Sequence, residues 1–188
     1  NGRIRKVGLD GIITTVAGGG NCSSIGCNDG RPATQARFYN LYSIAVAADG
    51  SLFLLDAPLV RRVGPDGIIS TVAGGGNCGY FCDGRSATEG SLSDPIGIAI
   101  ADDGSLLIAE FNGNRIRRVG PDGIINTIAG GGNCAGSGCG DGGPAIQANP
   151  FPVGVSISSD KSILISELGS RIRRVGPDGI INTIAGGG

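Results

Sequence analysis

The chain has 188 residues, of which 37 are Gly and 40% are hydrophobic, with no His, Met or Trp and a formal net charge of −1. Glycine without a three-residue period excludes collagen, and abundant apolar residues at near-neutral charge exclude intrinsic disorder. No apolar run approaches the length of a membrane-spanning helix. The lack of His removes the commonest general base and zinc ligand. Because residue 1 is Asn, we expect that a longer precursor was processed or that the sequence represents only part of a chain.

The first 20 residues of the chain recur, with a few substitutions, as its last 20 residues. Residues 1–20 are identical to residues 169–188 at 14 of 20 positions, and a 56-residue step separates the glycines at 8, 64, 120 and 176. The chain therefore divides into the last two strands of a repeat unit at 1–20 and three complete units, each preceded by a loop, at 21–76, 77–132 and 133–188.

Each period predicts four short strands joined by tight turns. In the second period the strands are expected at 96–101, 105–110, 115–119 and 124–129. Asp103-Gly104 predicts a hairpin, and Gly120-Pro121-Asp122-Gly123 predicts a turn. No segment has a helical period, so the fold class is all-β, built from four-stranded antiparallel meanders. Such sheets are apolar on both faces and must pack on one another, which favours propeller blades.

The repeat carries a family resemblance. Leu107-Ile108-Ala109-Glu110 precedes Asn114-Arg115-Ile116-Arg117-Arg118-Val119, and a Gly-Asp-Gly-Gly-Pro-Ala segment begins at Gly140. This pattern resembles NHL-repeat β-propellers, in particular the bacterial and teneurin-type extracellular repeats. The resemblance implies β-propeller blades, about three and a half in this chain. It leaves function open, because similar propellers include protein-binding domains, RNA-binding domains and a few enzymes.

The cysteines occur as one pair in each loop that precedes a unit: Cys22 and Cys27, Cys78 and Cys82, Cys134 and Cys139. Whole units separate the loops, so we expect three local disulfides and an oxidising, extracellular or cell-surface location. Zinc is the alternative, and it would require two loops to converge. The spacing is not that of a redox Cys-x-x-Cys motif. Asn21 begins the only Asn-x-Ser/Thr sequon, which makes it a candidate glycosylation site.

Eleven of the 15 basic residues lie on the repeated third strand. A row of arginines can follow a phosphate backbone, but each unit also ends its second strand with a carboxylate. We therefore expect structural ion pairs between these carboxylates and arginines of the third strand. The carboxylates are Asp56, Glu110 and Glu167, and the arginines are Arg61, Arg117 and Arg173. The loop residues Asp29, Asp83 and Asp141 are interpreted as turn residues, because one acid per loop falls short of the ligands that calcium needs.

These observations favour a non-enzymatic extracellular repeat scaffold that mediates protein–protein interaction or self-assembly, into a fibril or a larger propeller. We expect no catalytic residues, cofactor or metal, and partners that are other copies of the chain or further blades of a longer one. Nucleic-acid binding and membrane insertion are not expected. The alternative is a propeller enzyme of the lyase or hydrolase type, with a metal site in blades outside this sequence.

Overall fold

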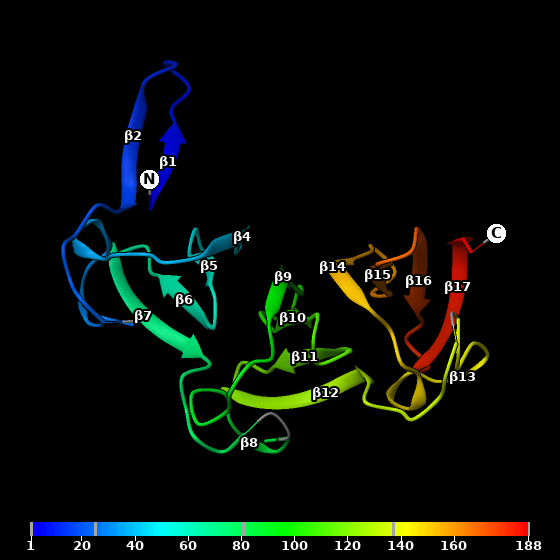
Figure 1. Cartoon of the computed structure of the whole chain (residues 1–188). Coiled ribbons are helices and arrows are strands. Elements are labelled where there is room, and N and C mark those ends of the chain that lie inside the picture. Colours follow the sequence, from blue (N-terminus) through cyan, green and yellow to red (C-terminus); the bar gives the residue numbers. More distant parts are fainter. Residues whose placement is uncertain (1, 25, 80–81, 137, 188) are drawn as a thin grey trace.

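The computed structural model describes residues 2–24, 26–79, 82–136 and 138–187. They form a two-stranded hairpin followed by three five-stranded antiparallel sheets, which are arranged in an open arc (Figure 1). Each five-stranded sheet is one propeller blade, so the predicted all-β class with propeller blades is confirmed. The described residues include no helix with the length and apolar character needed to span a membrane.

The hairpin at the start of the arc corresponds to the outer two strands of a blade, and we call it the half-blade. It consists of β1 (Arg3–Val7) and β2 (Ile13–Gly18), paired antiparallel. In the turn between them, the N–H of Gly11 donates to the carbonyl of Gly8 at 2.9 Å.

The three blades share one order of elements. The first contains β3 (Arg31–Pro32), β4 (Leu41–Val46), β5 (Leu52–Asp56), β6 (Leu59–Val63) and β7 (Ile68–Ala73). The second contains β8 (Arg85–Ser86), β9 (Pro95–Ile100), β10 (Leu106–Glu110), β11 (Arg115–Val119) and β12 (Ile124–Gly130). The third contains β13 (Gly143–Pro144), β14 (Pro152–Ile157), β15 (Ile163–Glu167), β16 (Arg171–Val175) and β17 (Ile180–Gly186). Short 3-10 helices, η1 (Ala33–Gln35) and η2 (Ala145–Gln147), follow β3 and β13.

The predicted four-stranded meander is present in every blade, and the boundaries in the second blade agree with the prediction to within one residue. Strands β4, β9 and β14 lie toward the inside of the arc, and β7, β12 and β17 lie toward its outside (Figure 1). The two-residue strands β3, β8 and β13 add a fifth, outermost position that the sequence did not predict. Two residues are too few to show an alternating pattern, so only pairing such as Ser86 with Ile124 defines them.

The hydrophobic core lies between the blades. Side chains alternate along each strand, so that Leu54 packs toward the half-blade while Leu55 packs toward the second blade. Between the second and third blades, Ile116 and Leu107 pack in one cluster with Ile165 of the third blade. Both faces of a blade are therefore apolar, as the repeat pattern predicts, and each blade is stabilised by its neighbours.

Candidate functional site

A buried arginine stands at the centre of the third meander strand in every blade: Arg61, Arg117 and Arg173 are at most 1% exposed. The Nη2 atom of Arg117 lies 2.7 Å from Oδ1 of Asp83, and that of Arg173 lies 2.6 Å from Oδ1 of Asp141. Arg61 pairs with Asp29 in the same way. Since each of these aspartates precedes its blade in a disulfide loop, each buried arginine fastens a loop to the blade that follows it.

The loop aspartates also bind the outer strand of the blade. The N–H of Thr71 donates to Oδ2 of Asp29 at 2.9 Å, and the N–H of Thr127 donates to Oδ2 of Asp83 at 3.0 Å. Their interpretation as simple turn residues was therefore incomplete. One signal could have shown the pairing: each aspartate follows the second cysteine of its loop by one or two residues and stands 32 or 34 residues before its arginine.

The charge of Asp141 is stabilised by this arrangement. Burial opposes its ionisation, but hydrogen bonds from Thr183 and the positive charge of Arg173 together lower the pKa of its carboxyl group. In addition, Nη2 of Arg173 donates to the carbonyl oxygen of Cys139 at 3.2 Å. An arginine enclosed in this way is already neutralised and serves to hold the loop.

The carboxylates at the ends of the second meander strands approach the arginines in two of the three blades. Oε2 of Glu110 lies 2.8 Å from Nε of Arg115 and 3.7 Å from Nη1 of Arg117. Oε1 of Glu167 lies 3.5 Å from Nη1 of Arg173. Burial raises the pKa of both glutamates, against the opposing effect of the neighbouring arginines.

The first blade departs from the prediction of an ion pair between Asp56 and Arg61. Oδ1 of Asp56 instead accepts the backbone N–H groups of Tyr39 and Asn40, at 2.7 and 2.9 Å. Within the described ranges, no ion pair includes Asp56. Aspartate is one methylene shorter than glutamate, so its carboxylate stays near the end of its own strand. The expectation for Asp56 is corrected accordingly, and Arg61 pairs with the loop residue Asp29.

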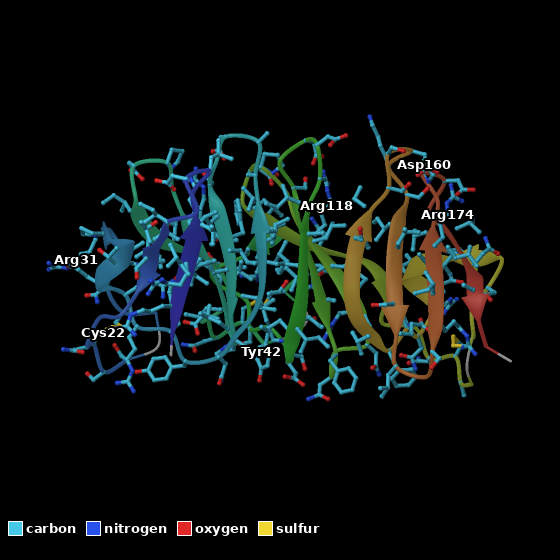
Figure 2. All side chains as sticks on the ribbon, turned by 90° about the horizontal axis from the view of Figure 1, so that it is seen from above. Cys22, Arg31, Tyr42, Arg118, Asp160 and Arg174 are labelled. Carbon is cyan, nitrogen blue, oxygen red and sulfur yellow. A yellow bond between two sulfur atoms is a disulfide. The ribbon has the colours of Figure 1, made fainter. Side chains whose placement is uncertain are left out.

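A second set of ion pairs repeats at the solvent-exposed turns on one side of the arc, where Figure 2 shows Arg118, Asp160 and Arg174. The distances from guanidinium nitrogen to carboxylate oxygen are 3.2 Å for Arg62–Asp49 and 2.7 Å for both Arg118–Asp103 and Arg174–Asp160. The opposite side carries Cys22 and Tyr42 (Figure 2). In each blade, the buried arginine of the third meander strand and the exposed arginine that follows it therefore both contact carboxylates.

We expect Asp160→Asn to make acid unfolding less steep. The hydrogen bond from Arg174, followed by those from Ser162, holds the pKa of the Asp160 carboxyl group well below its ordinary value. A pKa lowered by folding adds stability above about pH 4, the ordinary range of a carboxyl group, and this stability is lost as the pH falls toward the folded-state pKa.

The measurement is the melting temperature, followed by circular dichroism, from about pH 7 down to about pH 2. Below the ordinary carboxyl range, the melting temperature of the wild type should fall more steeply than that of Asp160→Asn. Arg174→Met, which removes the partner, should change the slope in the same direction. Parallel curves for all three proteins would show that this hydrogen bonding contributes nothing to stability.

The six cysteines form three disulfides within the loops, Cys22–Cys27, Cys78–Cys82 and Cys134–Cys139, which confirms the predicted local pairing over the zinc alternative. Asn21 is exposed beside the first disulfide, and its glycosylation stays a prediction. Over residues 2–24, 26–79, 82–136 and 138–187, no three His, Cys, Asp or Glu side chains gather in a way that could hold a metal ion.

The chain is similar to known proteins in both sequence and structure. A family model described as the teneurin NHL domain matches residues 21–78 and 75–137. Teneurin-m of Drosophila melanogaster is 31% identical over 188 aligned residues, which cover 93% of this chain and 6% of that protein. The chain thus spans only a small part of the length of this relative.

Among solved structures, virginiamycin B lyase from Staphylococcus aureus superposes with a TM-score of 0.56 at 21% identity, covering 97% of this chain and 48% of the lyase. A structural genomics protein from Bacteroides thetaiotaomicron superposes with a TM-score of 0.67 at 18% identity, covering 98% of this chain and 43% of that one. At these identities the likeness establishes the propeller fold alone. The match of the family model over more than half of the residues goes further: the chain belongs to the teneurin NHL-domain family.

Proposed function

We propose that the chain is a non-enzymatic extracellular NHL scaffold that mediates protein–protein interaction or self-assembly. Membership of the teneurin NHL-domain family supports this role. The three loop disulfides support an oxidising compartment outside the cell or at its surface. The blades also repeat the same buried arginine and loop aspartate, a pattern that suits a scaffold, since a catalytic centre needs different groups in different places.

The observation that carries the proposal is an apolar surface on the half-blade, which we call the open N-terminal face. Val7 and Ile13 on this face are 63% and 53% exposed. The residues at the same repeat positions in the first blade, Val63 and Ile69, are 5% and 0% exposed. A surface that is buried between blades everywhere else in the chain is therefore suited to receive another blade.

The other end of the arc carries the complementary surface, the open C-terminal face. Ala185 is exposed and Ile172 is half-buried, whereas their counterparts in the second blade, Ala129 and Ile116, are completely buried. Within the arc, those counterparts pack in one cluster with residues of the third blade that are equivalent to the open N-terminal face. The two open faces thus offer the two halves of an interblade contact, to a further blade of the same polypeptide or to a second copy.

We expect Ile13→Asp to weaken self-association of the 188-residue chain by roughly tenfold or more, because joining the open faces would bury an unpaired charge. Analytical ultracentrifugation over a range of concentrations measures the association constant, and electron microscopy shows whether the assembly forms discs or filaments. The matched control is Thr14→Asp, which adds the same charge at the neighbouring exposed position. A wild type that stays monomeric, or equal loss in both variants, would contradict a role for these faces.

The second candidate is a propeller enzyme, and the observation in its favour is the structural likeness to a lyase. The 188 residues contain no His, so a histidine-dependent centre would have to come from other blades. Metal analysis of the native protein separates the two functions: a stoichiometric metal that is needed for turnover favours the enzyme, and a metal-free protein that still assembles favours the scaffold.

A further inference from the structure

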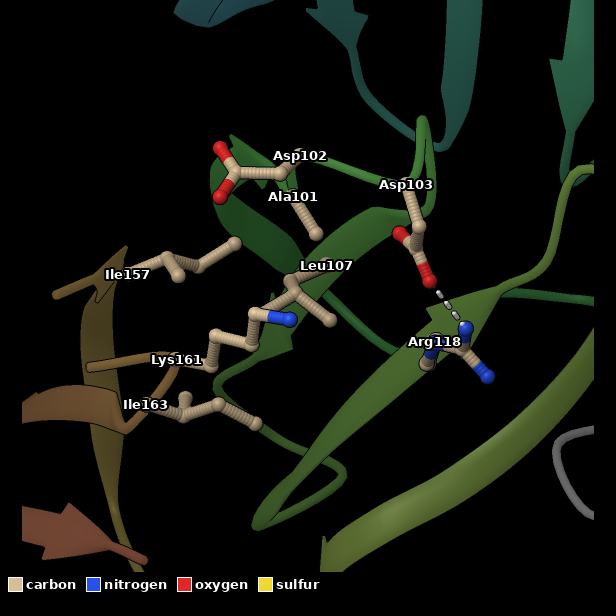
Figure 3. Close-up of a pocket in the computed structure, with 8 residues that line it drawn as sticks. All are labelled: Ala101, Asp102, Asp103, Leu107, Arg118, Ile157, Lys161 and Ile163. Atoms are coloured by element: carbon tan, nitrogen blue, oxygen red, sulfur yellow. Dashed lines mark hydrogen bonds and ion pairs between the residues drawn. The ribbon is translucent and has the colours of Figure 1, made fainter. Parts of the chain in front are cut away.

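A pocket of about 220 Å³ lies between the second and third blades, on the side of the arc that carries Arg118 (Figure 3). Leu107, Ile157 and Ile163 form its apolar part, and Asp102 and Lys161 also line it, with the Lys161 side chain directed toward Leu107 (Figure 3). Sites that enclose a whole small molecule usually measure about 300–1,000 Å³. The size and apolar lining of this pocket suit a single inserted side chain.

Two residues that line the pocket depart from the repeat. Lys161 occupies the turn position held by Gly50 and Gly104 in the other blades, with a backbone φ of 66° in the left-handed region that favours glycine. Asp102 occupies the position held by Ala48 in the first blade. Within the described ranges, Lys161 forms no ion pair. The repeat is thus altered at a pocket between two blades, and the alteration places an ammonium group there that forms no ion pair within the described ranges.

A third departure from the repeat lies on the half-blade. The turn between β1 and β2 has Leu9 where the corresponding turns of the three blades have proline. Leu9 is fully exposed. The adjacent Asp10 accepts the N–H of Ile12 at 3.0 Å, and the same bond forms in the other turns, so the turn keeps its shape while an apolar side chain projects from it.

The turn and the pocket face the same side of the molecule. In an antiparallel meander, the turn after the third strand lies at the same end as the turn after the first strand. The ion pair between Arg118 and Asp103 joins these two ends in the second blade, at the rim of the pocket. The β1–β2 turn is the equivalent of the turn after the third strand.

We propose that Leu9 of one copy of the chain inserts into the pocket of a second copy. The Leu9 side chain would bury its apolar surface against Leu107, Ile157 and Ile163, and the carboxylate of Asp10 would approach the ammonium group of Lys161. The partner is assigned to a second copy because the same chain supplies a projecting leucine with an adjacent acid and an apolar pocket with a free cation. A contact between two different patches is heterologous and leads to a closed ring or to an extended array.

This contact rests on the proposed self-associating scaffold but uses a different surface, so it is tested in the Ile13→Asp background, where the open N-terminal face carries a charge. Two further variants restore the residues of the other blades and should fold normally: Leu9→Pro and Lys161→Gly. Sedimentation equilibrium measures the association constant. Leu9→Pro should weaken association by roughly tenfold or more, because a leucine side chain is no longer buried, and Lys161→Gly should weaken it less.

Mixing the two variants gives a positive test. The Leu9→Pro chain keeps an intact pocket and the Lys161→Gly chain keeps an intact turn, so the mixture should associate more tightly than either variant alone. The control is Ile146→Ser, which removes another exposed apolar side chain, 57% exposed on η2, and should leave association unchanged.

Three results would overturn the contact: no association in the Ile13→Asp background, association that Leu9→Pro leaves intact, or equal loss in Ile146→Ser. The second of these would leave the proposed scaffold standing with another contact surface. If Ile13→Asp abolishes association and Leu9→Pro in the otherwise wild-type chain has no effect, self-assembly is assigned to the open faces and insertion of Leu9 is rejected.

Discussion

Arg173→Met should lower the free energy of unfolding by about 3–5 kcal/mol, the usual result of removing one partner from a buried ion pair. Arg173 is completely buried, and it contacts Asp141 at 2.6 Å and Glu167 at 3.5 Å. Methionine fills much of the same volume but leaves the buried Glu167 carboxyl group without this guanidinium and releases the loop at Asp141. Urea unfolding of the disulfide-intact protein, followed by circular dichroism, measures the loss.

The neighbouring residue gives the matched control. Arg174 pairs with Asp160 across a surface where the two side chains are 40% and 51% exposed, so Arg174→Met should change the free energy of unfolding by no more than about 1 kcal/mol. Hydrogen exchange should place the extra opening of Arg173→Met in the third blade and its loop. Equal losses in the two variants would show that the buried arginine does not hold the loop to the blade.

Ile116→Asp should lower the free energy of unfolding by at least about 4 kcal/mol, or prevent folding, because it removes apolar contacts and buries a carboxylate without a partner. Ile116 is completely buried in the cluster between the second and third blades. The expected result is loss of the cooperative unfolding transition, measured by urea denaturation and by the exposure of apolar surface to a fluorescent dye.

The repeat offers an internal comparison for this prediction. Ile172 is the same residue at the same position of the third blade, but its face of the blade is open and the side chain is only half-buried. Ile172→Asp should therefore cost less than half as much stability as Ile116→Asp in the monomer. If the two variants are equally unstable, burial between blades is not what makes this position sensitive.

Much of the fold could be predicted because the same physical pattern occurs three times. The alternating apolar residues, the Gly-Pro-Asp-Gly turns and the 56-residue step specify the meander, and one strand prediction supports the next. The local disulfides were predictable for a similar reason, since whole blades separate the cysteine pairs. The short outer strands were not predictable, because two residues are too few to show an alternating pattern. They are strands only because they pair with a strand that lies far along the chain.

The ion pairs show where sequence reasoning reached its limit. The carboxylate at the end of each second strand suggested one kind of pair, which holds for Glu110 and Glu167 and fails for Asp56. Reach decided the outcome. Glu110 accepts the backbone N–H of Ser93 at 2.9 Å and still approaches Arg117, whereas Asp56, which is one methylene shorter, accepts backbone N–H groups and forms no ion pair within the described ranges. The stronger partners, exemplified by Asp83, lie in loops whose path across the blade no local pattern describes.

The sequence by itself determined the repeat, the all-β blades, the disulfide pairing and the fact that each blade needs a neighbour, because these follow from residue periodicity and from cysteine spacing over short distances. Only the tertiary structure decided which acid meets each buried arginine and that Lys161 and Asp102 share a pocket. These depend on distances between residues of different blades and loops. Such distances arise when the sheets pack, and no single stretch of sequence contains them.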